Sequence, residues 1–472
     1  MYGIARPGPR NPFKKLINPD SQKTPSARAL ALDVLAGAER RNRWVEDLLA
    51  AALKRYPGLE RRDRALLLEL VQGVKRWELR LDFVLARLSH IPLPKLHPLV
   101  VRILRLTAFQ ILMLDRVPAR AALHEAGQLA KARGLPKSHV GFINAVLRRL
   151  AAGELPPWPS LTDDAVAALS VEYSHPAWLV KRWLERYGLE ETQARLAANN
   201  QIPPLCIRVN TLKTHREGLQ ARLAREGVDA RPCRFSPVGL QLTACAESPG
   251  GLPSYREGLW LFQDEAAQLV SLLLPLKPGQ KVVEMGAGRG GKTSHLAEAL
   301  DNQGLLLAVD NHRGRLGELG RTLGRWGVTI GRPLLADAAG ALPVKAGLMD
   351  AAVVDAPCSG LGIIRRHPEI KGRLKEKDLS TFPSRQRAML NNAAAILKPG
   401  GRLLYITCTT EPGENEEVAA GFLADHPDFH PGADPGLLPS AARVLVNSAG
   451  FFQTSPDAHN MDGFFAVVFN RR

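Results

Sequence analysis

The chain has 472 residues, of which 45% are hydrophobic and 23% charged, a composition that excludes a small disulfide scaffold and a mainly disordered chain. The net charge of +17 is unevenly spread, because Lys and Arg outnumber Asp and Glu by 28 to 12 in residues 1–150 and by only 35 to 34 in residues 151–472. A basic first third joined to a charge-balanced remainder suggests a polyanion-binding domain attached to a catalytic one, although a basic surface kept for solubility gives the same count.

Cysteine spacing and apolar segments bear on the compartment of the protein. None of the five cysteines is spaced as CxxC or has a histidine partner, which argues against structural zinc and against a secreted, disulfide-bonded protein. The twelve histidines show no metal-ligand spacing. The N-terminus lacks the apolar run of a signal peptide, and no stretch approaches the ~20 apolar residues of a membrane span. We therefore expect a soluble, cytoplasmic monomer without a metal, membrane contact or obligate protein partner.

The first third of the chain is predicted to be helical. Residues 1–25 carry Pro, Gly and Lys without periodicity and are expected to form a flexible tail. Residues 26–152 place apolar side chains such as Leu67, Leu70 and Val74 on one helical face and contain almost no strand signals. This pattern predicts an all-α bundle of about five to seven helices. Three prolines then predict a stiff linker within residues 153–165.

The rest of the chain mixes strand and helix signals. Residues 166–253 predict a small α+β module, with helices over Pro176–Tyr187 and Arg216–Glu226 and a strand over Ile207–Asn210. Residues 254–472 alternate strand-like and helix-like segments, which is typical of βαβ units and predicts a Rossmann-type, doubly wound, mostly parallel sheet.

The predicted strands of this sheet end in polar residues. The strand-like runs are Val282–Glu284, Leu305–Asp310, Ala351–Asp355 and Leu403–Cys408. Ligands of doubly wound sheets bind beyond the carboxyl ends of the strands. The candidate site residues are therefore Glu284, Asp310, Asp337, Asp355 and Cys408.

A glycine-rich loop, Gly286–Thr293 (GAGRGGKT), follows the first of these strands and fits three motifs. Read as GxxxxGKT, it is a phosphate-binding loop with Lys292 at the lysine position. Read as GxGxxG, it binds a dinucleotide, with Asp310, 22 residues after Gly288, as the ribose-binding acid. The third interpretation is the loop that cradles the methionine end of S-adenosylmethionine. The loop alone does not decide between them.

The neighbouring residues favour the third interpretation. A methyltransferase would use Asp310 for the ribose hydroxyls and Asp337 for the adenine edge, and it would leave Asp355 and the two cysteines Cys358 and Cys408 for chemistry. A nucleotide hydrolase or a dinucleotide dehydrogenase would leave both cysteines without a role. The sequence therefore predicts an S-adenosylmethionine-dependent methyltransferase.

The paired cysteines indicate which atom is methylated, although a buried structural role is the alternative for any single cysteine. Carbon 5 of a cytosine becomes nucleophilic when a thiolate adds to carbon 6 while a carboxyl group assists at N3, and a base must then remove the carbon 5 proton. Asp355, Cys358 and Cys408 supply this minimal set. A free thiol has a pKa of ~8.5, so the site must lower that value. Neither residue type nor spacing says which cysteine attacks.

Four motifs point to a known family. In chain order they are EMGAGRGGKT, VVDAPCSGLGIIRRHPEIK, YITCTTEPGENE and HNMDGFFAVVF. This series resembles the Sun family of RNA cytosine-5 methyltransferases, and the resemblance runs from about Ser26 to the C-terminus. The helical part, with RDRALLLELVQGVKRWELRLD and INAVLRRLA, resembles the NusB-like RNA-binding domain. That pairing is typical of the bacterial member acting on small-subunit ribosomal RNA.

The resemblance implies a role for each candidate residue. Cys408 would be the nucleophile, Cys358 would help to release the methylated product, and Asp355 would contact the base. The residues implied to hold S-adenosyl-L-methionine are Gly286, Ala287, Gly288, Arg289, Gly290, Gly291, Lys292, Asp310, Asp337 and Asp355.

This chain departs from the family pattern in its glycine loop. The family loop usually reads C-A-A-P-G-G-K-T, and here Gly286 stands for Cys, Gly288 for Ala and Arg289 for Pro. Glu284 replaces the usual Asp. The loop still carries small residues at positions 286 and 288, and position 284 is still acidic. We therefore expect cofactor binding to survive, with the Arg289 cation near a sulfonium.

Other residues have weaker interpretations. Lys292 would either contact the cofactor carboxylate or simply end the loop. Gln263–Glu265 is predicted to cap a helix that lines the cofactor pocket. A basic cluster after the DAPCSG motif is predicted to form a rim that guides RNA, with a solvated loop as the alternative; its members are Arg365, Arg366, His367, Lys371, Arg373, Lys375 and Lys377.

Taken together, these features predict a methyltransferase that modifies carbon 5 of a cytosine in RNA, with small-subunit (16S) ribosomal RNA as the expected substrate. The alternatives are a P-loop nucleotide hydrolase and a non-catalytic RNA-binding factor in which the altered loop no longer binds its cofactor.

Overall fold

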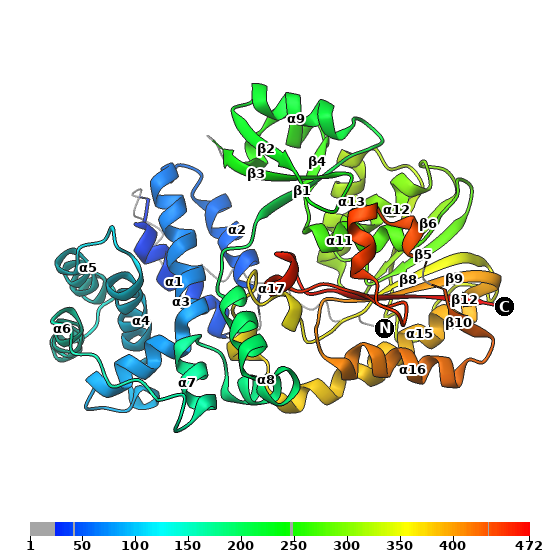
Figure 1. The fold of residues 1–472 in the computed structure, drawn as a ribbon. Coiled ribbons are helices and arrows are strands. Elements are labelled where there is room, and N and C mark those ends of the chain that lie inside the picture. Colours follow the sequence, from blue (N-terminus) through cyan, green and yellow to red (C-terminus); the bar gives the residue numbers. More distant parts are fainter. Residues whose placement is uncertain (1–23, 41–42, 246–248, 433) are drawn as a thin grey trace, which may run out of the picture. The chain divides into compact units, whose positions relative to one another are not determined.

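The computed structural model describes residues 24–40, 43–245, 249–432 and 434–472, which form two compact units (Figure 1). Unit 1 comprises residues up to 200 together with 367–373, and unit 2 comprises residues 201–366 and 374–472. The chain therefore passes between the units after Asn200, Arg366 and Arg373. The predicted tail, residues 1–25, lies almost wholly outside the described residues.

Unit 1 is helical, as its apolar periodicity predicts. Its main helices are α1 (Ala27–Arg40), α2 (Val45–Arg55), α3 (Arg61–Leu88), α4 (Pro98–Met113), α5 (Ala119–Ala132), α6 (Lys137–Ala151), α7 (Ala165–Glu172) and α8 (Ala177–Asn199). The predicted stripe of Leu67, Leu70 and Val74 is buried in one core. Gly73 lets α3 approach α4 closely, because a Cβ at this position would lie 1.9 Å from Cζ of Phe109.

Helix α8 is longer than its sequence pattern predicts. The predicted helix ends at Tyr187, and the next residue, Gly188, has φ +74° and kinks the backbone. Helical hydrogen bonding resumes after the kink and continues to Asn199. Glycine accepts this left-handed conformation without a steric cost, so the interruption does not end the element.

A short piece of chain from beyond residue 366 completes unit 1. Within His367–Arg373, which includes the short helix α14 (Ile370–Arg373), the Glu369 Oε1 atom accepts the backbone N–H of Val45 at 2.9 Å. Lys371 Nζ donates to the carbonyl of Arg76 at 3.0 Å and to Oδ1 of Asn200 at 2.6 Å.

The RNA-guiding rim predicted from the basic cluster is therefore wrong at Lys371, which is buried. Arg373 donates to the carbonyl of Arg43, so its guanidinium is also engaged within unit 1. Lys375 and Lys377 are exposed, so the predicted rim stays a prediction for these two lysines.

Unit 2 begins with a four-stranded antiparallel sheet in the order β2-β3-β1-β4. The strands are β1 (Leu205–Val209), β2 (Val228–Pro232), β3 (Gly239–Cys245) and β4 (Trp260–Phe262), and the helices are α9 (Arg216–Arg225) and α10 (Pro253–Arg256). Leu219 and Leu223 of α9 share a core with the sheet residues Ile207 and Leu240. Strand β4 follows the boundary predicted at residue 253, so the small sheet extends to Phe262.

The large sheet of unit 2 has the order β10-β12-β9-β8-β5-β6-β7, with β11 paired to β12. Its strands are β5 (Lys281–Met285), β6 (Leu305–Asp310), β7 (Gly331–Leu335), β8 (Met349–Asp355), β9 (Leu397–Thr407), β10 (Phe429–Pro431), β11 (Phe452–Gln453) and β12 (Phe465–Arg471). Strands β9, β8, β5, β6 and β7 are parallel, and β12 joins β9 antiparallel.

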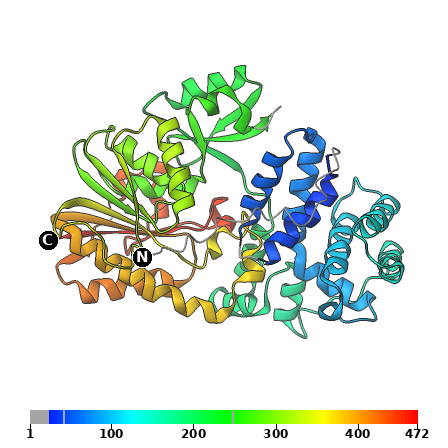
Figure 2. The same cartoon turned by 180° about the vertical axis from the view of Figure 1, so that it is seen from behind.

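Helices cover both faces of this sheet (Figure 2). They are α12 (Gly291–Ala299) and α13 (Arg313–Trp326) on one face and α15 (Phe382–Ile396) and α16 (Glu416–Asp425) on the other; α11 (Glu265–Leu269) and α17 (Pro456–His459) are short. Val282 and Leu404 pack with Leu296 of α12, whereas Val283 packs with Phe422 of α16. The predicted doubly wound sheet is confirmed. Among the described helices, none combines the length and apolarity needed to cross a membrane.

Candidate cofactor and catalytic site

The polar residues predicted at strand ends lie at one edge of the large sheet. Asp310 is the last residue of β6, Asp355 is the last residue of β8, and Cys408 directly follows β9. Glu284 is the penultimate residue of β5, and Asp337 follows β7 by two residues. Because these strands are parallel, their carboxyl ends meet at the same edge, where ligands of such sheets bind.

The glycine loop connects β5 to α12 in a conformation that requires glycine. Gly286, Gly288 and Gly290 have φ of +89°, +57° and +88°. A Cβ on Gly286 would lie 2.2 Å from the carbonyl oxygen of Asp355, so the loop passes close to the end of β8. The loop leads directly into the N-terminus of α12 at Gly291, and a helix N-terminus favours an anionic ligand group.

Asp310 is pre-oriented next to this loop. Its Oδ2 atom accepts the N–H of Gly288 at 3.0 Å and its Oδ1 atom accepts the N–H of His312 at 2.8 Å. Asp337 is half exposed, and its Oδ1 atom accepts the N–H of Ala339 at 3.0 Å and a bond from Arg385. The residues present fit a nucleoside cofactor: a fixed acid beside a glycine cradle and a second acid beyond the next strand.

Arg289 stands where the family usually has proline and was expected to lie near a sulfonium, but its side chain forms an ion pair with Glu318. Its Nε atom lies 2.8 Å from Oε2 of Glu318 on α13, and both side chains are about half exposed. The positive charge is therefore compensated at the outer side of the loop.

Lys292 contacts Asp355, with 2.8 Å between Nζ and Oδ2. Burial alone would lower the pKa of Lys292, but the neighbouring acidic groups, Asp355 foremost, together outweigh burial and the pKa is raised. Burial raises the pKa of Glu284, directly behind this pair, to about 8, and the Asp355 charge adds to the effect. At neutral pH the site therefore holds an ion pair beside a protonated carboxyl group.

Cys358 and Cys408 face each other with their sulfur atoms 3.3 Å apart. The hydrogen bond to Cys408, followed by burial, raises the pKa of Cys358 well above its usual value. Cys358 therefore keeps its proton at neutral pH.

Sequence reasoning missed Glu414, which supports the cysteine loop. Its Oε2 atom accepts the N–H of Ser359 at 2.9 Å and a bond from Gln386 at 3.0 Å, while Tyr405 donates to its carbonyl. Burial raises the pKa of Glu414. The residue stands in the motif YITCTTEPGENE, but nothing local to that motif indicates that it reaches the loop of Cys358.

Arg208 of β1 was also missed, and it ties the small sheet to the glycine loop. Its side chain is fully buried and donates to the carbonyl of Gly291 at 2.7 Å and to Ser294 Oγ at 2.6 Å. It also pairs with Glu298 of α12 at 3.0 Å. The start of α12 is thus fixed in part by the small module.

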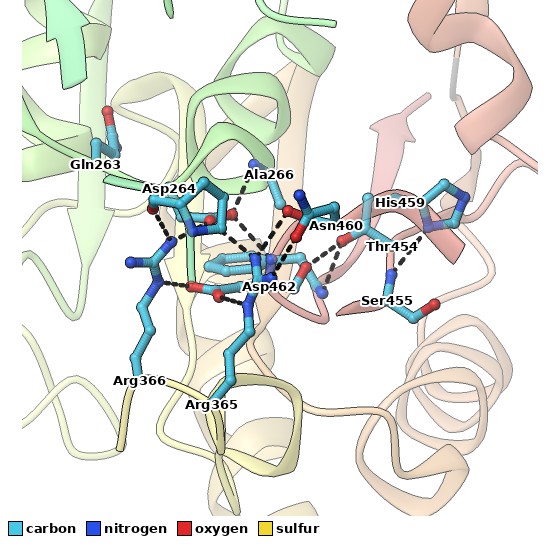
Figure 3. A network of polar contacts seen from close by, with 12 residues as sticks. Gln263, Asp264, Ala266, Arg365, Arg366, Thr454, Ser455, His459, Asn460 and Asp462 are labelled. Atoms are coloured by element: carbon cyan, nitrogen blue, oxygen red, sulfur yellow. Dashed lines mark hydrogen bonds and ion pairs between the residues drawn. The ribbon is translucent and has the colours of Figure 1, made fainter. Parts of the chain in front are cut away.

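Two further members of the basic cluster are not free to guide RNA. Arg365 and Arg366 pair with Asp462 at 3.0 and 2.6 Å, and Arg366 also pairs with Asp264 at 2.6 Å (Figure 3). The prediction that these two arginines form part of a rim is wrong, because buried carboxylates bind them. Asp264 does cap α11, as predicted, by accepting the N–H of Ala266.

A doubly wound sheet with a glycine loop after β5 and an acid at the end of β6 is shared by dinucleotide-binding enzymes and S-adenosylmethionine-dependent methyltransferases, and the comparisons with known proteins place this chain among the methyltransferases. Three family models match the chain: "16S rRNA methyltransferase RsmB/F" over residues 271–470, the NusB family over residues 25–152, and the "Methyltr_RsmF/B-like, ferredoxin-like domain" over residues 175–247. The chain belongs to the RsmB/F family of methyltransferases, which confirms the resemblance inferred from its motifs.

Relatives and solved structures agree with this assignment. The "Probable ribosomal RNA small subunit methyltransferase B" of Synechocystis is 35% identical over 93% of this chain and 98% of its own, and the "Ribosomal RNA small subunit methyltransferase B" of Pseudomonas putida is 37% identical over 90% and 94%. The crystal structure of PH0851 is 26% identical, with a TM-score of 0.81 over 96% of this chain and 100% of that chain. A methyltransferase homologue from Pyrococcus horikoshii is 27% identical, with a TM-score of 0.55 over 66% and 99%.

Proposed function

We propose that this protein methylates carbon 5 of a cytosine in small-subunit ribosomal RNA through a covalent cysteine adduct. The observation that carries the proposal is the 3.3 Å separation of the Cys358 and Cys408 sulfur atoms beside Asp355 at the same sheet edge. The names of the relatives support the choice of RNA, and the basic charge of residues 1–150 suits a phosphate backbone.

In this mechanism Cys408 adds to carbon 6 as a thiolate. The S–C6 bond forms, and the electron pair of the C5=C6 bond becomes available at carbon 5, while Asp355 assists at N3. S-adenosylmethionine held by the glycine loop and Asp310 would supply the methyl group, with the methyl–sulfur bond exchanged for a bond to carbon 5.

Cys358 then acts in product release. Once the Cys408 sulfur is bonded to carbon, its hydrogen bond no longer raises the pKa of Cys358. The Cys358 thiol then gives its proton to solvent, and the resulting thiolate accepts the carbon 5 proton. The pair of electrons from the C5–H bond restores the double bond, and Cys408 leaves as a thiolate.

Transfer of radiolabelled methyl groups from S-adenosylmethionine to unmodified small-subunit ribosomal RNA tests the proposal. We expect label in 5-methylcytidine after nuclease digestion. Label in any other nucleoside would contradict the carbon 5 assignment, and cofactor binding by calorimetry without any transfer to RNA would contradict the substrate.

A further inference from the structure

Four charged side chains form a buried cluster beside the cysteine loop. They are Asp264, Arg365, Arg366 and Asp462, and we name them the Arg–Asp cluster (Figure 3). Arg365 Nε lies 3.0 Å from Asp462 Oδ1, and Arg366 Nε lies 2.6 Å from Asp462 Oδ2. The side chains of Asp264, Arg365 and Asp462 are each no more than 5% exposed. A buried ion cluster of this kind is a weak source of stability, so a geometric role is the better explanation for it.

The cluster joins three segments of unit 2 that are distant in sequence. Asp264 stands before α11, the two arginines follow the Cys358 loop, and Asp462 precedes β12. Asp264 Oδ1 also accepts the N–H of Asp462 at 3.1 Å, and Arg365 donates to Oδ1 and to the carbonyl of Asn460, each at 3.0 Å. Thr454 donates to the carbonyl of Asp462 at 2.7 Å, so the backbone around Asp462 is held from both sides.

A chain of backbone hydrogen bonds connects the cluster to the end of the Cys358 loop and to the backbone of Cys408. Gly463, next to Asp462, donates its N–H to the carbonyl of Gly362 at 2.7 Å, and Gly362 donates its own N–H to the carbonyl of Cys408 at 3.0 Å. The two glycines touch so closely that a Cβ on Gly362 would lie 1.9 Å from the oxygen of Gly463. The loop of Cys358 is thus fastened to the backbone of Cys408 at a point that Asp462 fixes.

We propose that the Arg–Asp cluster is a positioning device that sets the separation of the Cys358 and Cys408 sulfur atoms. The inference rests on the proposed function in that these cysteines carry out the chemistry. Asp462, Arg365 and Arg366 are positioning residues, because they act through the backbone at Gly362 and Gly463 and touch no reacting atom.

Asp462→Asn tests the proposal, because it keeps the size of the side chain and removes the charge that two arginines share. We expect kcat for methyl transfer to fall about 10- to 100-fold, as for a small misplacement of reacting groups, while KM for S-adenosylmethionine stays within about twofold. Asp350→Asn is the matched control: Asp350 also pairs with a cationic side chain, Lys398, at 2.7 Å, but it lies at the start of β8, away from the site. Its kcat should not change.

A second measurement reports on the sulfur atoms without any need for methyl transfer. Diamide, an azo oxidant, takes up the two hydrogens of the Cys358 and Cys408 thiols as an S–S bond forms, and it becomes a hydrazine. We expect this disulfide, located by peptide mass spectrometry, to form quickly in the wild type and in Asp350→Asn and at least about fivefold more slowly in Asp462→Asn.

Arg366→Gln keeps the test decisive should Asp462→Asn fold poorly. It removes the ion pairs of Arg366 with Asp264 and Asp462 but leaves the pair of Arg365 with Asp462 in place. We therefore expect a smaller fall in kcat and a smaller decrease in the rate of disulfide formation. Wild-type kcat and a wild-type disulfide rate in a folded variant of either kind would overturn the proposal. If the wild type transfers no methyl group to RNA while the disulfide rates separate as expected, the proposed function fails and the positioning role stands.

Discussion

The proposed mechanism gives the two cysteines different roles, so their alanine variants should behave differently. In the proposed mechanism Cys408→Ala removes the sulfur that adds to carbon 6, so methyl transfer should be abolished. Cys358→Ala leaves the addition intact but removes the group that takes the carbon 5 proton, so a covalent protein–RNA adduct should accumulate. Migration with labelled RNA on a denaturing gel measures both. An adduct formed by the Cys408 variant would show that the roles of the two residues are reversed.

Glu284 predicts how the stability of the protein depends on pH. Its pKa in the folded protein, about 8, is above the usual value of a carboxyl group, so the folded state binds the proton more tightly than the unfolded state. The free energy of unfolding should therefore fall as pH rises between the two pKa values and change little above about pH 8. Each pH unit in that window costs roughly 1.4 kcal/mol.

The matching variant is Glu284→Gln, which has no proton to lose. Between pH 6 and pH 9 the wild type should lose about 2–3 kcal/mol more of its unfolding free energy than this variant. Urea unfolding at the two pH values measures the difference. Parallel losses in both proteins would mean that Glu284 titrates near its ordinary value.

Sequence reasoning located single residues better than it located their partners. Asp310, Asp355 and Cys408 stand at strand ends because a buried apolar run stops at a polar residue, and that signal is local. The pairing of Lys292 with Asp355 spans 63 residues and that of Arg365 with Asp462 spans 97. No local pattern encodes such pairs, which is why Arg365 and its neighbours were predicted to form a rim that guides RNA.

At the scale of the element, the glycine loop predicts a defined steric effect. Gly286→Ala would bring a Cβ to 2.2 Å from the Asp355 carbonyl, so the loop must shift and the affinity for S-adenosylmethionine should fall at least about 10-fold by calorimetry. Gly279→Ala is the control: Gly279 also has a left-handed backbone, φ +87°, but a Cβ there meets nothing within 4 Å.

The outcome of that pair separates steric clash from backbone strain. An equal loss of cofactor affinity in both variants would mean that backbone strain alone causes the effect, because both glycines have a positive φ. Wild-type affinity in Gly286→Ala would mean that the loop can adopt a backbone suited to the cysteine that the family usually has at this position.

Strands β5, β6 and β8 were predicted to within two residues, whereas β9 begins six residues before its predicted start at Leu403. β6 matches its predicted range, and β5 and β8 each begin one or two residues earlier than predicted. Strands such as β4 and β10, of three residues each, carry too few side chains for alternation to be detected. Their place in a sheet depends on the longer strands beside them.

At the scale of the molecule, the basic charge of unit 1 predicts the salt dependence of RNA binding. Lys131 and Lys137 are exposed on either side of the turn between α5 and α6. Replacing both with Gln should weaken RNA binding at low salt and reduce the slope of log affinity against log salt by about 0.7–0.9 for each phosphate that the protein no longer neutralises. Filter binding at several salt concentrations measures the slope. Lys345→Gln, an exposed cation of the charge-balanced part, should leave it unchanged.

The seven residues His367–Arg373 affect how unit 1 folds while the protein is being synthesised. Unit 1 starts at the N-terminus, yet the atoms that bind Lys371 and Glu369 acquire these partners only when the chain has been synthesised to Arg373. At about 5–20 residues per second, the ribosome needs roughly 10–35 s to add the 173 residues that follow Asn200. During translation unit 1 therefore cannot form the hydrogen bonds of Glu369 and Lys371 until most of unit 2 has been synthesised.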